Sequence, residues 1–175
     1  MLDPTTVDPA RLRSLSDAPL RSSARYVLYW MQQAQRAHGN PALEVAVEQA
    51  NALDLPVLVA FGLDDGYPGA NLRSMAYLLD GLADVAEALR ARGIAFAVRR
   101  GSPPEVAAAF AQEAAAVIVD RGYLRHQRAW RRQDYDRQRD PAEAYQRIEG
   151  DPSIQEGAIF FRNTATIRDR SYDVV

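Results

Sequence analysis

Four short apolar runs alternate with three amphipathic segments between residues 25 and 120, and this alternation most constrains the fold. Because the runs are rich in β-branched and aromatic residues, they are typical of strands. The most uniformly apolar run is typical of a strand that is buried on both faces. The segments between them repeat apolar residues at helical spacing. Alternating strands and helices predict an α/β fold, a parallel sheet of about five strands with helices on both faces. The runs are RYVLYW (25–30), LPVLVAFGL (55–63), IAFAV (94–98) and AAVIVD (115–120).

Helix boundaries are marked by local signals. Asn40 stands directly before Pro41, the order expected at the start of a helix. The second helix is expected to end just before Gly93, since glycine commonly terminates helices. The sequence SPPE at 102–105 has capping-box spacing, which predicts a third helix running to about Ala115. The stripe that defines the second helix is Leu72, Met75, Leu79, Leu82, Ala86 and Leu89.

The regions outside the alternating block carry weaker patterns. Residues 1–24 are expected to form an N-terminal arm with one short helix near Pro9–Leu15. Residues 25–131 form the predicted α/β domain, and residues 132–175 a C-terminal extension of divergent sequence. Within that extension, GAIFFRN (157–163) is a candidate for a late strand.

Composition excludes several kinds of chemistry. The chain has 175 residues, the size of one domain, and contains no cysteine, so thiolate catalysis, disulfides and Cys-ligated metals are excluded. All 21 cationic residues are arginine, which removes Schiff-base lysines and the P-loop lysine. His38 and His126 have polar neighbours and no partner at metal-ligand spacing, so both are interpreted as solvated surface side chains and no metal site is predicted. No apolar run reaches membrane-spanning length, and a cytoplasmic location is the expectation.

A basic segment follows the last predicted strand. Residues 121–139 contain seven arginines and two aspartates, with aromatic residues between them, in a chain of net charge −2. Arginine with aromatics suits phosphate contact and base stacking. A solvated helix whose arginine stems cover the edge of the sheet would have the same composition. Both interpretations stay open for the candidate interface or nucleic-acid residues Arg121, Tyr123, Arg125, Arg128 and Trp130.

Ligands of parallel α/β sheets bind beyond the carboxyl ends of the strands. Four loops of this chain are expected there: MQQAQRAHG, GLDDGYPG, RRGSPP and DRGYLR. In the second loop, Asp64 and Asp65 could bind a metal or a ribose, but a turn before Gly66 is the favoured interpretation. No glycine-rich dinucleotide or phosphate loop follows the first strand.

Several of these segments resemble a known family. The blocks YWMQQAQR (29–36), NPAL (40–43) and DRGYLRHQRAW (120–130) resemble, in order and spacing, the N-terminal α/β domain of class II DNA photolyases, over about Arg25 to Arg131. The resemblance implies a Rossmann-like sheet that can hold an antenna chromophore: a deazaflavin, a reduced folate or a flavin. The residues that would line its site are Trp30, Met31, Gln32, Gln33, Arg36, Phe61, Gly62, Leu63, Gly101 and Asp120.

The same resemblance limits the expected activity. In the family, a large helical domain binds the catalytic FAD and the damaged DNA, and the residues after Arg131 leave no room for it. No catalytic residue and no catalytic FAD site are therefore expected, direct DNA binding is doubtful, and repair would need a separate FAD-binding photolyase domain as partner. The open alternatives are a truncated relic, one half of a split photolyase, and an adenine-nucleotide-binding or interaction module.

Overall fold

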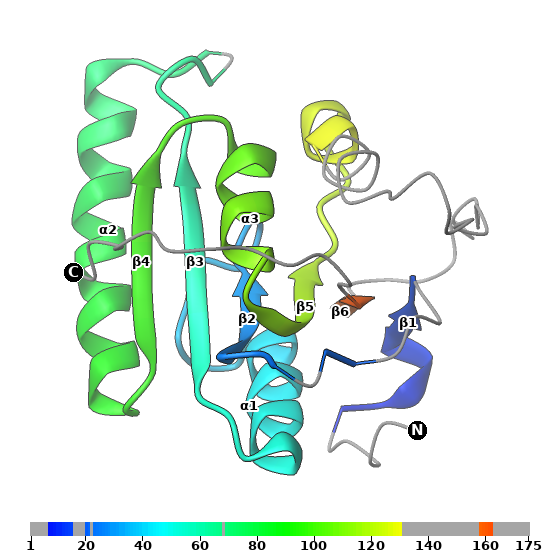
Figure 1. Ribbon diagram of the computed structural model, residues 1–175. Helices are drawn as coiled ribbons and strands as arrows, with labels where there is room; N and C mark the ends of the chain where they lie inside the picture. The colour runs from blue at the N-terminus through cyan, green and yellow to red at the C-terminus, as the bar shows by residue number, and fades with distance from the viewer. Residues whose placement is uncertain (1–6, 16–19, 22, 68, 131–157, 163–175) are drawn as a thin grey trace.

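The computed structural model of the protein describes residues 7–15, 20–21, 23–67, 69–130 and 158–162. For Pro9 and for residues 158–162 it describes the backbone alone. The prediction that residues 132–175 form a separate extension therefore lies almost wholly outside the described residues. Figure 1 shows the arrangement of the elements along the chain.

A single sheet of six strands forms the centre of the described part of the chain (Figure 1). The strand order is β1-β6-β5-β2-β3-β4, and the four strands β5, β2, β3 and β4 are mutually parallel. This confirms the predicted parallel α/β sheet. The strands are β1 (Leu12–Ser14), β2 (Tyr26–Trp30), β3 (Val57–Leu63), β4 (Ala95–Arg100), β5 (Ala114–Asp120) and β6 (Ala158–Arg162).

One edge of the sheet differs from the expectation. β6 forms the late strand expected at 157–163, but it runs antiparallel to β5. β1 pairs parallel with β6, so a short piece of the predicted N-terminal arm joins the sheet after a 3-10 turn at Pro9–Arg11. An antiparallel strand at the edge of a largely parallel sheet is a common arrangement.

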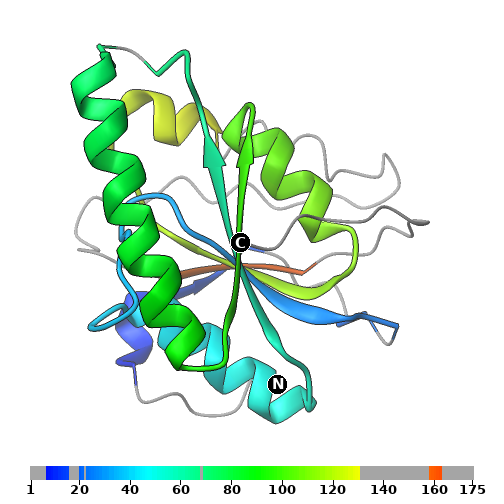
Figure 2. The ribbon, with the colours of Figure 1, turned by 90° about the vertical axis from the view of Figure 1, so that its left-hand side faces the viewer.

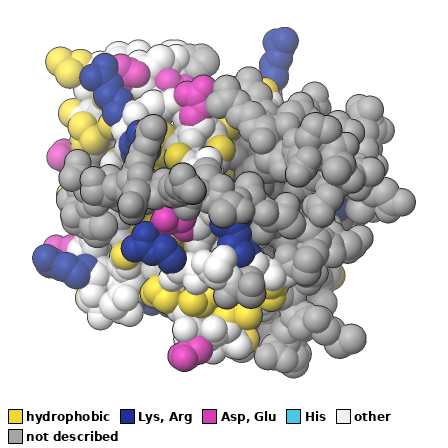
Figure 3. Space-filling view, in the orientation of Figure 1, with side chains coloured by type: hydrophobic (Ala, Val, Ile, Leu, Met, Phe, Trp, Pro, Cys, Tyr) yellow, Lys and Arg dark blue, Asp and Glu magenta, His cyan; other side chains and the backbone are white. Residues whose placement is uncertain are grey.

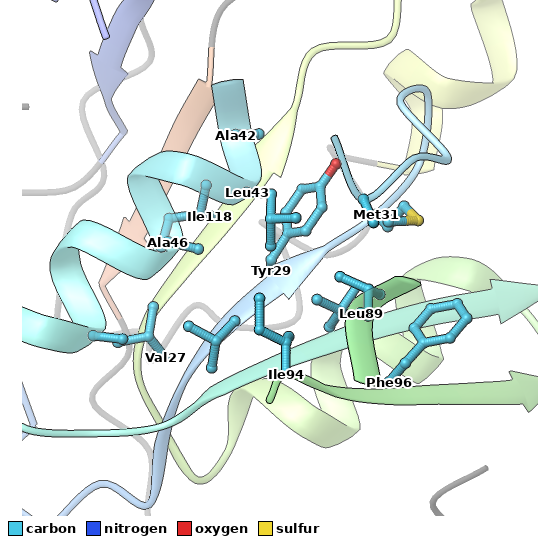
Figure 4. Close-up of a cluster of buried hydrophobic side chains, with 14 of the residues drawn as sticks. Val27, Tyr29, Met31, Ala42, Leu43, Ala46, Leu89, Ile94, Phe96 and Ile118 are labelled. Atoms are coloured by element: carbon cyan, nitrogen blue, oxygen red, sulfur yellow. The ribbon is translucent and has the colours of Figure 1, made fainter. Parts of the chain in front are cut away.

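Helices cover both faces of the sheet. α1 (Pro41–Leu53) and α2 (Leu72–Ala91) pack on one face, and α3 (Pro103–Ala111) packs on the other. Figure 2 shows α2 and α3 on opposite sides of the strands. Because successive side chains of a strand point to opposite faces, Val27 and Tyr29 belong to the α1 side and Leu28 and Trp30 to the α3 side. Figure 4 shows the cluster on the α1 and α2 side, including Tyr29 and Leu43.

Two helix boundaries follow the predicted signals. Asn40 caps α1, since its side-chain oxygen accepts a hydrogen bond from the Leu43 N–H at 3.2 Å. α2 ends at Ala91, and Gly93 then adopts a φ of 72°, a backbone conformation that glycine tolerates best. At its other end α2 begins with a capping box between Asn71 and Ser74.

Two helix predictions are wrong. α3 ends at Ala111 rather than near Ala115, because Ala114 already pairs with Tyr26 in β5, and Ser102 makes no side-chain capping bond. The alanine-rich sequence suits either structure, and pairing with β2 decides it. On α2, Leu72 and Leu79 are 88% and 48% exposed, so the predicted stripe is rotated. The buried face consists of Leu82, Val85 and Leu89.

Candidate functional site

The order of the strands creates a crevice between β5 and β2. The chain steps from β2 outward to β3 and β4, and β5 then returns to the other side of β2. Connections leaving β2 and β5 therefore diverge, which is the place where ligands bind in open α/β sheets. The loop after β2 (31–40) and residues 121–124 after β5 border this point.

A carboxylate of the protein occupies the crevice. Asp120 is 7% exposed, and its Oδ1 accepts a hydrogen bond from the Gln32 backbone N–H at 2.9 Å. Its Oδ2 accepts from the Gln33 N–H at 2.5 Å and from the Ala34 N–H. Burial raises the pKa of Asp120 above its ordinary value, although these hydrogen bonds from the backbone act in the opposite direction. Asp120 therefore fixes the loop after β2, and its own side chain takes the position where an external anion would meet these N–H groups.

A pocket of about 290 Å³ lies beside this crevice, at the carboxyl ends of β2 and β3. Its wall combines the loop after β2, the end of β3, the 64–70 loop, the first turns of α2 and the start of α3. In Figure 1 the 64–70 loop and the helical residues 125–130 lie at this end of the sheet. The lining residues are Met31, Gln32, Gln35, Phe61, Gly62, Asp64, Tyr67, Gly69, Ala70, Ser74, Met75, Leu78, Pro103, Gln127 and Trp130.

Aromatic rings form one side of the pocket. Tyr67 and Trp130 line it, with ring centroids 6.1 Å apart. His126 lies edge-on to both, at 4.8 Å from Tyr67 and 4.9 Å from Trp130. Its Nε2 atom is buried and has no hydrogen-bond partner in the described part of the chain. The interpretation of His126 as a solvated surface side chain is therefore wrong, because the ring packs between two aromatics, whereas His38 is exposed as expected.

The walls of this pocket suit a planar organic ring. Most lining groups are apolar or aromatic, and small-molecule pockets usually combine such walls with a few converging polar groups. Gln32 is a polar residue of this kind: it is buried in the pocket wall, and neither its Nε2 nor its Oε1 has a partner among the residues that the structure describes. Burying an amide without a partner is unfavourable, so this group is suited to meet a ligand.

Comparison with known proteins places these features in a family. Residues 27–144, more than half of the chain, match the DNA photolyase family. The chain belongs to that family. The match includes β2 from Val27 onward, β3, β4, β5 and all of the segments that line the pocket.

Curated relatives of this photolyase-family chain carry the name deoxyribodipyrimidine photo-lyase. The protein of Methanothermobacter thermautotrophicus is 48% identical over 120 residues, which cover 69% of this chain and 27% of the relative. Those of Arabidopsis thaliana and Potorous tridactylus are each 32% identical, over 71% and 69% of this chain and 26% and 23% of the relatives. The chain thus spans about a quarter of the length of the curated relatives it matches.

The structure brings some of the predicted cofactor residues of the photolyase-family chain together. Met31, Gln32, Phe61 and Gly62 all line the pocket. Gly62 has a packing role as well, because a Cβ added there would lie 2.5 Å from the Cα of Pro103. Whether these residues hold a chromophore stays a prediction.

The remaining predicted residues lie outside the pocket wall. Trp30 is fully buried in the core on the α3 side, and Leu63 packs against the core on the other face. Arg36 is exposed and donates from Nε to the Gly39 carbonyl. Gln33 accepts a hydrogen bond from Gln127 Nε2, and Asp120 acts through the loop that it fixes. The further residue of this group, Gly101, has a φ of 143° and lies just before α3.

Of the fifteen residues in the pocket wall, only four were among the predicted cofactor-binding residues. The missed residues come mainly from the 64–70 loop and from α2, whose apolar positions were assigned to the core. The two acidic residues of that loop have structural partners, in line with the turn interpretation. Asp64 accepts a hydrogen bond from the Gly66 N–H at 2.9 Å, and Asp65 forms an ion pair with Arg100. The position of the GLDDGYPG loop, directly after a buried strand, was the sequence signal that could have identified these pocket residues.

The basic segment is described only as far as Trp130. The Arg121 guanidinium lies 5.3 Å from the centre of the Tyr123 ring, a cation–π arrangement. Tyr123, Arg125 and Arg128 are exposed, whereas Trp130 is half-buried against the core and the pocket. On the face of the molecule in Figure 3, arginine and acidic side chains are interspersed.

Neither a metal-binding cluster nor a membrane-spanning helix is present among the described residues. In that part of the chain, no group of three or more His, Cys, Asp or Glu side chains is arranged to hold a metal ion. No helix there combines the length and the hydropathy that crossing a bilayer requires.

Proposed function

We propose that this domain holds a planar light-harvesting chromophore in the pocket at the ends of β2 and β3. A deazaflavin, a reduced folate and a flavin are the candidates. The observation that carries the proposal is the pocket itself, whose wall is mainly apolar and aromatic and includes Gln32, a residue whose buried amide atoms have no partner among the described residues. Membership of the photolyase family supports a light-dependent role for such a ligand.

The residues of the pocket suit the binding of a ring by its faces and its edge. Phe61, Met31 and Met75 offer apolar and polarizable surface, and the rings of Tyr67 and Trp130 offer aromatic contact. The volume of about 290 Å³ lies near the lower end of the range for small-molecule pockets, so it suits a ring system better than a whole dinucleotide. These side chains would orient the ring and exclude water from it.

The wider role we propose is in the repair of ultraviolet-induced pyrimidine dimers. When bound, such a chromophore absorbs light and passes its excitation energy to a catalytic flavin. We propose that this flavin belongs to an FAD-binding photolyase domain that contacts the exposed residues after β5, Tyr123, Arg125 and Arg128 among them. The motifs YWMQQAQR and DRGYLRHQRAW support an assignment to the class II enzymes.

An adenine nucleotide is less well suited to this site. A nucleotide in an α/β crevice usually places its phosphates against backbone N–H groups beyond a strand. Here the N–H groups of the loop after β2 already donate to Asp120, and a second negative charge would lie beside that buried carboxylate. The geometry therefore favours an uncharged ring over a phosphate group in this region.

The proposal is tested by reconstitution. The purified protein is incubated with each of the three chromophores, passed through a desalting column, and its absorption is recorded between roughly 350 and 500 nm. We expect at least one chromophore to be retained at about one per chain.

Ala70→Trp, which fills the pocket, is expected to abolish retention, because Ala70 lies in its wall. Ala76→Trp is the matched control, because Ala76 lies exposed on α2 outside the pocket wall. Retention of none of the chromophores by the wild type, or equal retention by the Ala70→Trp variant, would contradict the proposal.

A further inference from the structure

Most polar side chains in the pocket wall already have partners. Gln127 donates from Nε2 to Gln33 at 2.7 Å and accepts at Oε1 from the Leu124 N–H at 3.2 Å. Ser74 is engaged in the capping box of α2, and Asp64 in its turn. These groups cannot turn to a ligand without losing a bond of the fold.

Gln32 differs from the other polar residues of the wall. The residue is 7% exposed, and both atoms of its side-chain amide lack a partner in the described residues. Gln35 is exposed to water, and its Nε2 donates to the Gln32 carbonyl at 3.1 Å. A carboxamide offers one N–H₂ donor and one carbonyl acceptor side by side.

The backbone of Gln32 is held at both of its polar atoms. Its N–H donates to Asp120 Oδ1 at 2.9 Å, and its carbonyl accepts from Gln35 Nε2. Met31 before it is buried, and its N–H donates to the Ala60 carbonyl at 3.0 Å. The backbone from which the Gln32 side chain extends is therefore held before any ligand arrives, which lowers the entropic cost of using this residue for recognition.

We propose that Gln32 determines the specificity of the pocket by reading a lactam edge, meaning a ring N–H beside a ring carbonyl. This inference rests on the proposed function. The Gln32 carbonyl accepts from the ring N–H, and its N–H₂ donates to the ring carbonyl, giving two parallel hydrogen bonds. Because either orientation of the amide presents one donor and one acceptor, the side chain can match the edge from either direction. Flavins, deazaflavins and pterins all carry such an edge.

The test uses ligands that differ only at this edge. Riboflavin and 5-deazariboflavin are compared with their N3-methyl derivatives, which lack the ring N–H. The affinity of each for the full chain is measured by fluorescence titration. We expect the wild type to bind at least one parent ring roughly tenfold or more tightly than its N3-methyl form, because methylation leaves the buried amide unpaired.

Variants assign this preference to the residue. Gln32→Leu is expected to bind the parent and the methylated ring within about twofold of each other. Gln112→Leu, the same change outside the pocket wall, is expected to keep the preference of the wild type. Gln32→Met, which keeps the length of the side chain and removes both amide atoms, provides a second variant if the leucine variant does not fold.

The outcomes separate the two claims. Equal affinity of the wild type for both forms of each ring would overturn the role of Gln32 and leave the proposed function in place. A preference that persists in the Gln32 variants would do the same, since another contact would then exclude the methyl group. Binding of neither form of either ring would overturn the role of Gln32, while retention of the reduced folate alone would still support the proposed function.

Discussion

Replacing Asp120 with alanine is expected to destabilise the protein and to release the loop after β2. In the wild type, the Asp120 carboxylate accepts hydrogen bonds from the backbone N–H groups of Gln32, Gln33 and Ala34. Alanine removes all three acceptors and leaves the buried Gln32 N–H without a partner. The other two N–H groups are partly buried and can reach water.

The size of the effect follows from opposing contributions. Three hydrogen bonds to a charged group contribute about 1.5–3 kcal/mol each, and the burial of one carboxylate offsets several kcal/mol of that sum. We therefore expect Asp120→Ala to lower the free energy of unfolding by about 3 kcal/mol, a large part of the usual 5–15 kcal/mol of a domain. Asp120→Asn keeps one acceptor oxygen but turns an N–H₂ group toward the donors, so a loss of about 2 kcal/mol is expected.

Urea denaturation gives the stability, and hydrogen exchange of the backbone amides of residues 32–34 gives the local effect. Exchange at these amides should accelerate more than exchange in the α1 core, since the carboxylate holds this loop. A loss below about 1 kcal/mol with unchanged exchange at residues 32–34 would refute the structural role of Asp120.

The dependence on pH has a defined sign. Because burial raises the pKa of Asp120, the folded state binds a proton at the Asp120 carboxyl group more tightly than the unfolded state does. The stability that this proton contributes is fully present below the ordinary pKa of about 3.9 and is lost as pH rises through the raised pKa. The difference in unfolding free energy between the wild type and Asp120→Asn should therefore shrink from acid toward neutral pH. A difference that grows with pH would contradict the assignment.

Two further predictions concern packing and charge. Gly62→Ala should lower the free energy of unfolding by about 1–3 kcal/mol, because the new Cβ would meet the Cα of Pro103. Gly81→Ala, in open space on α2, should raise the free energy of unfolding by about 0.5–1 kcal/mol. Thermal denaturation measures both, and equal effects would contradict the close contact at Gly62. The hydrogen bonds and charge of Arg100 lower the pKa of Asp65, so any stability from this pair is present above the ordinary pKa and lost as pH falls through the lowered one. Arg100→Gln should raise the Asp65 pKa in an NMR titration, and an unchanged value would show that the pair does not persist in solution.

The layered fold could be predicted from sequence because its signals are local and agree with one another. The apolar runs became β2 to β5, and Asn40 and Gly93 mark helix boundaries as expected. The predicted apolar stripe of α2 was wrong for a definite reason. The predicted stripe and the observed buried face share Leu82 and Leu89, and helical spacing alone cannot decide which of the two faces is buried. The antiparallel direction of β6 depends on pairing between distant segments, which local pattern does not reveal.

The pocket was predictable only in part. Met31 and Gln32 directly follow β2, and Phe61 and Gly62 lie at the end of β3, so they were predicted because the carboxyl ends of parallel strands meet at one edge. Tyr67 and Trp130 come together on one side of the pocket from segments far apart in sequence, so no spacing rule connects them. Asp120 was expected to line the cofactor site, but its carboxylate instead accepts hydrogen bonds from the loop after β2. These partners depend on the path of that loop, which the sequence pattern does not reveal.

The account depends most on where a chromophore binds, and NMR of the backbone amides measures this directly. On titration with 5-deazariboflavin, we expect the largest shift changes at Gln32, Phe61, Gly62 and Ala70, which surround the pocket. Gly93, at the far end of α2 and outside the pocket wall, should not respond. Saturable shifts centred on the 81–93 region, with the pocket amides unchanged, would contradict the account.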